Sequence, residues 1–70
     1  MAIPNSEAYL TPREAEVLHL LATGATNPEI AGQLVITERT VKAHVTRILA
    51  KRNATTRTEA VAKANQLNLL

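Results

Sequence analysis

The sequence predicts an all-α fold, a bundle of four short helices that contains a helix-turn-helix. Apolar residues recur at helical spacing in four segments, near residues 12–23, 28–34, 38–51 and 57–68. Between the second and third segments lie only Val35, Ile36 and Thr37. Two amphipathic helices joined by so short a turn must cross at a steep angle, as they do in a helix-turn-helix.

The first helix is predicted to begin at Pro12, after a lead-in or linker over residues 1–9 that has no apolar period. Pro12 keeps Thr11 out of helical geometry, as an N-cap requires, and proline is itself favoured at the first helical position. Glu14 is placed to close a capping box on the Thr11 amide. Gly24 then supplies the left-handed residue that commonly ends a helix.

The second helix is predicted from a start signal like that of the first, and the third from the residue that ends it. Asn27 and Pro28 repeat the polar–proline pattern, so the second helix is expected over about 28–34. The third is expected over about 38–51. Asn53 follows it, and asparagine tolerates the positive φ of a helix end better than other non-glycine residues do.

The fourth helix is predicted to open with a capping box between Thr56 and Glu59 and to cover about 57–68. Its core-facing side is expected to carry Ala60, Val61, Ala64 and Leu67. A second surface of this helix keeps apolar positions that the core does not need. We therefore expect a homodimer contact, a weak one, at Ala62, Asn65, Gln66 and Leu69.

Size and composition allow one small domain, here expected over residues 10–70. The chain has no cysteine, which excludes disulfides, a thiolate nucleophile and a cysteine-based zinc site. It shows no membrane-spanning stretch and no signal peptide, so we expect a cytoplasmic protein without a membrane partner. Because Tyr9 is the one aromatic residue, the core must consist of small aliphatic side chains.

The charges of the chain are unevenly distributed. Residues 1–38 carry one basic and five acidic side chains, a net charge of −4, whereas residues 39–70 carry seven basic and one acidic, a net charge of +6. A one-sided positive field of this kind attracts a polyanion such as nucleic acid. The alternative explanation is an ordinary solvated surface, and the position of the charges on a candidate recognition helix favours nucleic acid.

No set of side chains supports an enzyme or a metal site. His19 is expected on the surface of the first helix. His44 lies between the two faces of the third helix, where half-buried packing or a hydrogen bond to the backbone is expected. The two histidines lack metal-ligand spacing, and no nucleophile, base and carboxylate form a catalytic set. We therefore expect no enzymatic activity, no cofactor, no metal and no small-molecule ligand.

The face of the third helix that points away from Val41, Val45 and Ile48 is predicted to read DNA bases. A lysine or arginine there can donate to guanine, and the methyl groups of alanine and threonine fit the thymine methyl. The predicted base contacts are Lys42, Ala43, Thr46 and Arg47. A charge run on a helix is usually only a solvated face, and it is the tight turn that favours base contact here.

Contacts with the DNA backbone are predicted at the starts of the second and third helices, where hydroxyl groups and helix N-termini can bind phosphate. At the start of the second helix, the expected phosphate contacts are Thr26 and Asn27. Thr37 is expected to act mainly as a cap, and Thr40 as either a phosphate contact or solvated surface. The basic segment 39–52 adds Lys51 as a further expected backbone contact.

The chain resembles the LuxR/FixJ/GerE-type DNA-binding domain of bacterial transcription regulators over about residues 10–67. The matching segments are LTPREAEVL (10–18), ATNPEIAGQL (25–34), ITERTVKAHVTRIL (36–49) and RTEAV (57–61). The resemblance implies a four-helix bundle whose third helix enters the major groove, dimerisation through the fourth helix, and paired half-sites near promoters. By position, Lys42, Ala43 and Thr46 match the base-contacting places of the family. Its backbone-contacting places correspond to Thr26, Asn27, Thr37, Arg39, Thr40 and Arg47.

The chain departs from the family at residues 52–54, where Arg-Asn-Ala stands in place of the usual Leu-Gly-Val. Arg52 falls on the buried stripe of the third helix. Its aliphatic stem is therefore expected to lie over the core while its charged head reaches solvent. This departure puts the stability of the junction between the third and fourth helices in doubt.

The leading interpretation is the DNA-binding output domain of a transcription regulator. One alternative is a helical module that binds a protein partner such as RNA polymerase, and another is a sigma-factor C-terminal domain. Binding to duplex DNA with a steep salt dependence separates the first interpretation from a protein-interaction module.

Overall fold

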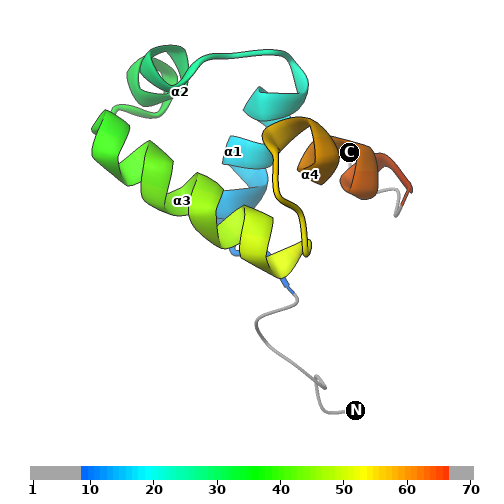
Figure 1. The fold of residues 1–70 in the computed structure, drawn as a ribbon. Coiled ribbons are helices and arrows are strands. Elements are labelled where there is room, and N and C mark those ends of the chain that lie inside the picture. The colour runs from blue at the N-terminus through cyan, green and yellow to red at the C-terminus, as the bar shows by residue number, and fades with distance from the viewer. Residues whose placement is uncertain (1–8, 67–70) are drawn as a thin grey trace.

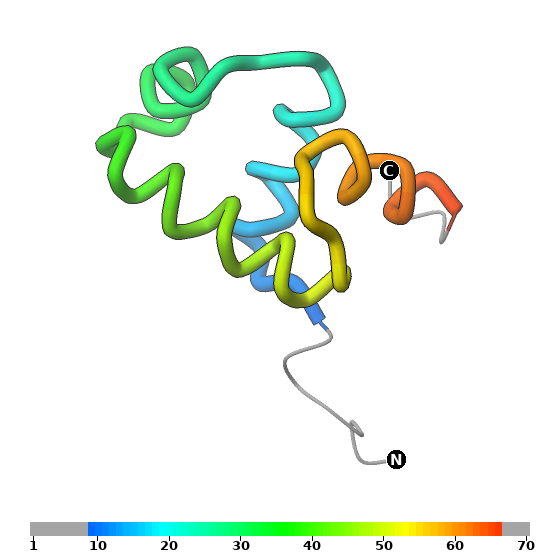
Figure 2. Tube along the Cα trace, viewed as in Figure 1, coloured from blue at the N-terminus to red at the C-terminus, as the bar shows by residue number. Residues whose placement is uncertain are grey.

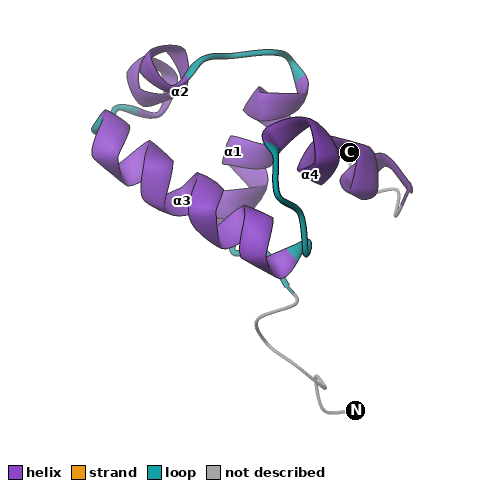
Figure 3. Cartoon of the chain, in the orientation of Figure 1, coloured by secondary structure: helices purple, strands orange, loops and turns teal. Residues whose placement is uncertain are grey.

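A computed structural model describes residues 9–66, which form four helices and no strand (Figures 1 and 3). In chain order these are α1 (Pro12–Ala22), α2 (Asn27–Leu34), α3 (Glu38–Lys51) and α4 (Arg57–Gln66). Figure 1 views α2 almost along its axis and α3 from the side, so these two helices cross steeply. The all-α class and the helix-turn-helix predicted from the sequence are confirmed.

Three predicted features lie outside the described residues. They are the lead-in except for Tyr9, the last turn of the predicted fourth helix at residues 67–68, and the expected dimer contact Leu69.

The start of α1 confirms the predicted capping box. The Glu14 amide donates to the Thr11 hydroxyl at 3.1 Å, and the Thr11 amide donates to the Glu14 carboxylate at 3.0 Å. Two otherwise unpaired amides are thereby satisfied, which anchors the first turn. This geometry also directs the Glu14 side chain, which is only 2% exposed, along the helix toward the core.

The start of α2 differs by one residue from the prediction. The N-cap is Thr26, and Asn27 and Pro28 occupy the first two helical positions. A reciprocal capping box joins Thr26 and Glu29, with bonds of 3.3 Å and 2.8 Å. A proline fits the second position as well as the first, because neither amide has a partner within the helix. This choice frees the Asn27 side chain from capping.

The start of α4 has a modified capping box. The Glu59 amide donates to the Thr56 hydroxyl at 3.1 Å, as predicted, but the Glu59 carboxylate accepts from the amide of Thr55 rather than that of Thr56. The loop between α3 and α4 is thus held to α4 at Thr55, one residue before the cap.

Among residues 9–66, three residues with positive φ follow the ends of helices. Gly24 has a φ of 87° and Asn53 a φ of 52°, and both confirm the predicted end signals. The third is Val35, the C-cap of α2, with a φ of 56°, which the sequence did not predict. A β-branched residue is disfavoured in this region, and Val35 is also 89% exposed.

The core lies where α3 crosses α1, with α4 closing one end. Helix α3 packs on α1, α2 and α4, and α1 also packs on α4 (Figure 2). The buried hydrophobic side chains are small aliphatics, as predicted: Val17, Leu18, Leu21, Ile30, Ala31, Val41, Val45, Ile48, Ala60 and Ala64. Leu34 and Ile36, next to the turn, pack against this core while remaining partly exposed. The core therefore sets the orientation of α3.

Arg52 is half-buried at the end of α3, where it lines a small hollow with Tyr9, Leu10 and Leu18. The prediction that its stem covers apolar side chains agrees with this position. Its Nε atom, however, is buried and forms no hydrogen bond with the described residues, so the head group reaches solvent only in part. Among residues 9–66, no helix is both long and apolar enough to cross a membrane.

Candidate nucleic-acid interface

Helix α3 separates its residues into a buried face and an exposed face. Val41 and Ile48 are completely buried and Val45 is 7% exposed, so one face is committed to the core. The opposite face consists of exposed side chains, namely those of Lys42, Ala43, Thr46 and Arg47. The structure thus brings together on one free surface all four residues that the sequence predicts as base contacts.

Within that surface, Thr46 already uses its hydroxyl proton. Its Oγ1 donates to the Lys42 carbonyl one turn earlier, at 3.0 Å. In this rotamer the side chain therefore presents a methyl group and oxygen lone pairs, but no free donor. This arrangement suits contact with the methyl group of thymine or with a base amino group.

The start of α3 presents two hydroxyls beside a basic side chain. Thr37 is the N-cap and accepts the Thr40 amide at 3.1 Å, so its predicted capping role is confirmed. The hydroxyls of Thr37 and Thr40 lie 2.9 Å apart. Arg39, which lies between them in the sequence, is exposed. Two hydroxyls and a basic residue in the first turn of a helix have the chemistry of a phosphate contact.

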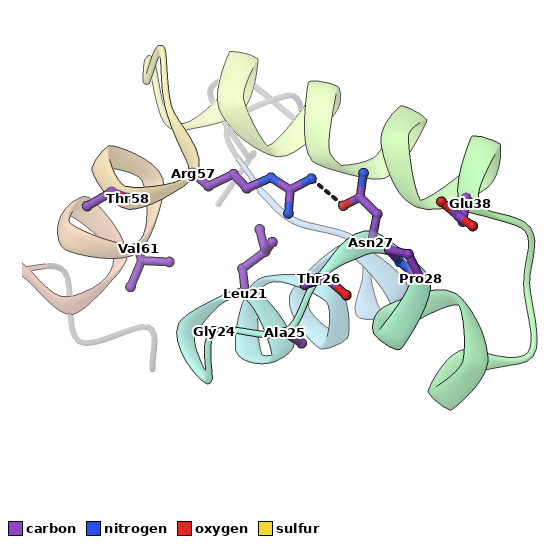
Figure 4. A pocket seen from close by; sticks show the side chains of 10 residues that line it. All are labelled: Leu21, Gly24, Ala25, Thr26, Asn27, Pro28, Glu38, Arg57, Thr58 and Val61. Atoms are coloured by element: carbon purple, nitrogen blue, oxygen red, sulfur yellow. Dashed lines mark hydrogen bonds between the residues drawn. The ribbon is translucent and has the colours of Figure 1, made fainter.

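The start of α2 opens onto a groove of about 680 Å³ that is shared with the end of α1 and the starts of α3 and α4 (Figure 4). Thr26 is exposed and Asn27 is half-buried. The carboxamide oxygen of Asn27 accepts a hydrogen bond from Arg57, the first residue of α4. The sequence did not predict this hydrogen bond, because Arg57 stands out in the sequence only as the residue that follows the cap Thr56.

Lys51 does not lie free at the interface, contrary to the expected backbone contact. Its ammonium group donates to the Glu14 carboxylate at 2.6 Å and to the Tyr9 carbonyl at 2.9 Å, and its side chain is only 16% exposed. The physical reason is that a buried carboxylate requires a counter-charge. Lys51 therefore holds the end of α3 onto α1, and we do not retain it as a DNA contact.

Two acidic groups show the electrostatic effect of these caps. Burial raises the pKa of Glu14, but the hydrogen bond from Lys51 and the Thr11 amide outweigh it, so the pKa lies below the usual 4.5. The pKa of Glu29 is lowered by hydrogen bonds from the Thr26 backbone and side chain. Both carboxylates are thus stabilised in their charged form.

The remaining predicted residues lie apart from this surface. Ala62, Asn65 and Gln66 are exposed on α4. His19 is exposed on α1, as predicted. His44 is half-buried, which confirms the packing alternative, and its Nδ1 atom forms no hydrogen bond with residues 9–66. In this part of the chain, no three metal-binding side chains gather.

Comparison with known proteins identifies relatives of this chain. The sequence profile of "Bacterial regulatory proteins, luxR family" matches residues 8–64. The transcriptional regulatory protein LiaR of Bacillus subtilis is 45% identical over 69 residues, which cover 99% of this chain and 32% of that protein. The response regulator VraR of Staphylococcus aureus is 51% identical over 61 residues, 87% of this chain and 29% of that protein. The chain thus spans about a third of the length of these relatives.

Two solved structures have the same fold. The response regulator ChrA of a heme-sensing two-component system superimposes with a TM-score of 0.89 at 37% identity, over 97% of this chain and 33% of that one. The transcription factor GerE superimposes with a TM-score of 0.82 at 32% identity, over 94% of this chain and 96% of that one. The second match spans nearly the whole of both chains.

Proposed function

The chain belongs to the luxR family of bacterial regulatory proteins, and on this premise we propose that it binds double-stranded DNA sequence-specifically as the output domain of a transcription regulator. The observation that carries this proposal is the free face of α3. It is exposed and basic, while the opposite face of the same helix is buried in the core. A rigidly mounted helix of this kind fits the major groove.

The contacts that we propose divide into two classes. Base contacts come from the free face of α3, at Lys42, Ala43, Thr46 and Arg47. Contacts with the phosphate backbone come from the starts of α2 and α3, at Thr26, Asn27, Thr37, Arg39 and Thr40. The second class positions the domain on the duplex, and the first class reads the sequence.

Two copies are proposed to bind two half-sites about one helical turn apart. The expected dimer contact is the exposed surface of α4, with Ala62, Asn65 and Gln66, together with Leu69. RNA polymerase is a further candidate partner of the bound regulator. A domain with this function acts in the bacterial cytoplasm, where the chromosome lies.

The decisive experiment begins with selection of binding sites from a pool of random duplexes, followed by affinity measurements on a selected and a random duplex. Lys42→Ala is expected to cost about 1–3 kcal/mol on the selected duplex and to relax specificity at one base position. Arg39→Ala should weaken both duplexes alike and reduce the salt slope by about 0.9.

The control for these variants is Arg13→Ala. Arg13 lies on α1 in an exposed ion pair with Glu16, outside the proposed interface, so both affinities should stay unchanged. If Lys42→Ala weakened the selected and the random duplex equally, Lys42 would be a phosphate contact and the base-reading assignment would be wrong. If the wild-type protein bound neither duplex, the proposed function would fail.

A further inference from the structure

The hydrogen bond between Arg57 and Asn27 joins two elements that otherwise barely meet. Helix α2 packs chiefly on α3, and its contacts with α1 and α4 are weaker. Within residues 9–66, no other side-chain hydrogen bond links α2 to another helix. Figure 4 shows the Arg57 side chain extending from the start of α4, past Leu21, to the carboxamide of Asn27. The start of α2 is therefore tied to α4 by one arginine.

This bond also determines which way the Asn27 carboxamide faces. Arginine has donors only, so the carboxamide must turn its oxygen toward Arg57. The amide nitrogen then branches away from the guanidinium (Figure 4), and within residues 9–66 its two N–H donors form no hydrogen bond. A carboxamide oriented in this way presents donors, not an acceptor, at the start of α2.

We propose that Arg57 is a positioning residue for DNA binding, which orients Asn27 so that the Asn27 amide group donates to a backbone phosphate. This inference rests on the proposed function and deepens it. Arg57 acts through Asn27 and does not itself neutralise a phosphate. The hydrogen bond supports this distinction, because the guanidinium is already engaged by the Asn27 oxygen inside the groove.

The first test measures the binding of Arg57→Ala to the selected duplex at several salt concentrations. We expect affinity to fall about tenfold, on selected and random duplexes alike, because a charge-assisted hydrogen bond that orients a phosphate donor is lost. The slope of log affinity against log salt should stay at the wild-type value. A slope reduced by about 0.9 would show that Arg57 contacts a phosphate directly and would overturn the proposal.

The second test is a double-mutant cycle. If Arg57 acts through Asn27, then Arg57→Ala should add almost no further loss in an Asn27→Ala background. Full additivity of the two losses would overturn the proposal, as would unchanged binding by Arg57→Ala alone. Wild-type protein that binds no duplex would instead refute the proposed function, so the two failures are distinguishable.

A third variant keeps the proposal testable if Arg57→Ala unfolds. Asn27→Asp retains an acceptor for Arg57 and makes the bond charge-assisted on both sides, but it removes the two N–H donors. Its melting temperature should not fall, whereas its affinity for the selected duplex should drop at least as far as that of Asn27→Ala. Undiminished binding by Asn27→Asp would show that the carboxamide donates to no phosphate.

Discussion

Glu14 shows how one charged side chain can be kept in the core of a small domain. It is 2% exposed, yet its carboxylate is matched by the Lys51 ammonium at 2.6 Å and the Thr11 amide at 3.0 Å. Burying an unpaired carboxylate would be strongly unfavourable, and these two partners offset that cost. The ion pair also joins α1 to the last turn of α3, so it helps to orient α3.

This ion pair predicts an acid-sensitive stability. Because the folded state lowers the pKa of Glu14, the carboxylate contributes its full stabilisation above pH 4.5 and loses it as the pH falls through the folded pKa. Glu14→Gln should be less stable at neutral pH by about 1–3 kcal/mol, since Lys51 loses its counter-charge. It should also lose less stability than the wild type on acidification. Thermal melts recorded by circular dichroism across this pH range would measure both effects.

Glu29 provides the control for the acid titration. Its pKa is also lowered, but by the Thr26 cap, and the Glu14→Gln substitution leaves that cap intact. The residual acid sensitivity of Glu14→Gln should therefore decrease further in a Glu14→Gln/Glu29→Gln double variant. Equal acid sensitivity of the wild type and Glu14→Gln would show that Glu14 does not titrate as described.

At the scale of the elements, the turn between α2 and α3 contains a strained backbone conformation at Val35. Val35 holds a φ of 56° with a side chain that is 89% exposed, so it pays the steric cost of the left-handed region and gains little burial. The amide of Val35 still bonds to the Ala31 carbonyl, and the Ile36 amide bonds to the same carbonyl at 3.0 Å. The end of α2 is satisfied by the backbone, whatever side chain stands there.

The turn therefore predicts a stabilising substitution. Val35→Asn should raise the free energy of unfolding by about 0.5–1 kcal/mol, because asparagine adopts a positive φ at a lower steric cost than valine. Val35→Thr is the matched control, since it makes the side chain polar while keeping the β-branch, and it should bring no gain. Urea unfolding of the three proteins would decide. An equal gain for both variants would attribute the effect to polarity and not to backbone strain.

At the scale of the whole molecule, the features predicted from sequence are those that local chemistry decides. The cap at Thr11, the positive φ at Gly24 and Asn53, and the division of α3 into two faces all follow from neighbouring residues. The roles of Lys51 and Arg57 could not be predicted from the sequence, because each depends on a partner at least 30 residues away. The local sequence pattern predicts that a lysine or arginine is exposed. It cannot indicate which carboxylate or carboxamide the fold places beside that side chain.

The dimer is the remaining property of the whole molecule, and α4 is where it can be tested. Ala62 is exposed on α4 and lies outside the surface that we propose for DNA, so Ala62→Glu adds a charge to the expected contact between copies. Affinity for a duplex with one half-site should be unchanged. On a duplex with two half-sites, the second copy should bind at least about tenfold more weakly than in the wild type, because the cooperative contact is lost.

Sedimentation velocity with a labelled duplex would count the bound copies. His19→Glu, on the exposed surface of α1, is the control for the added negative charge and should leave the binding of the second copy unchanged. If Ala62→Glu bound two half-sites as cooperatively as the wild type, the contact would lie elsewhere than on α4. If the wild type itself placed a single copy on the two-site duplex, this domain would act as a monomer, and pairing would have to come from other parts of a longer regulator.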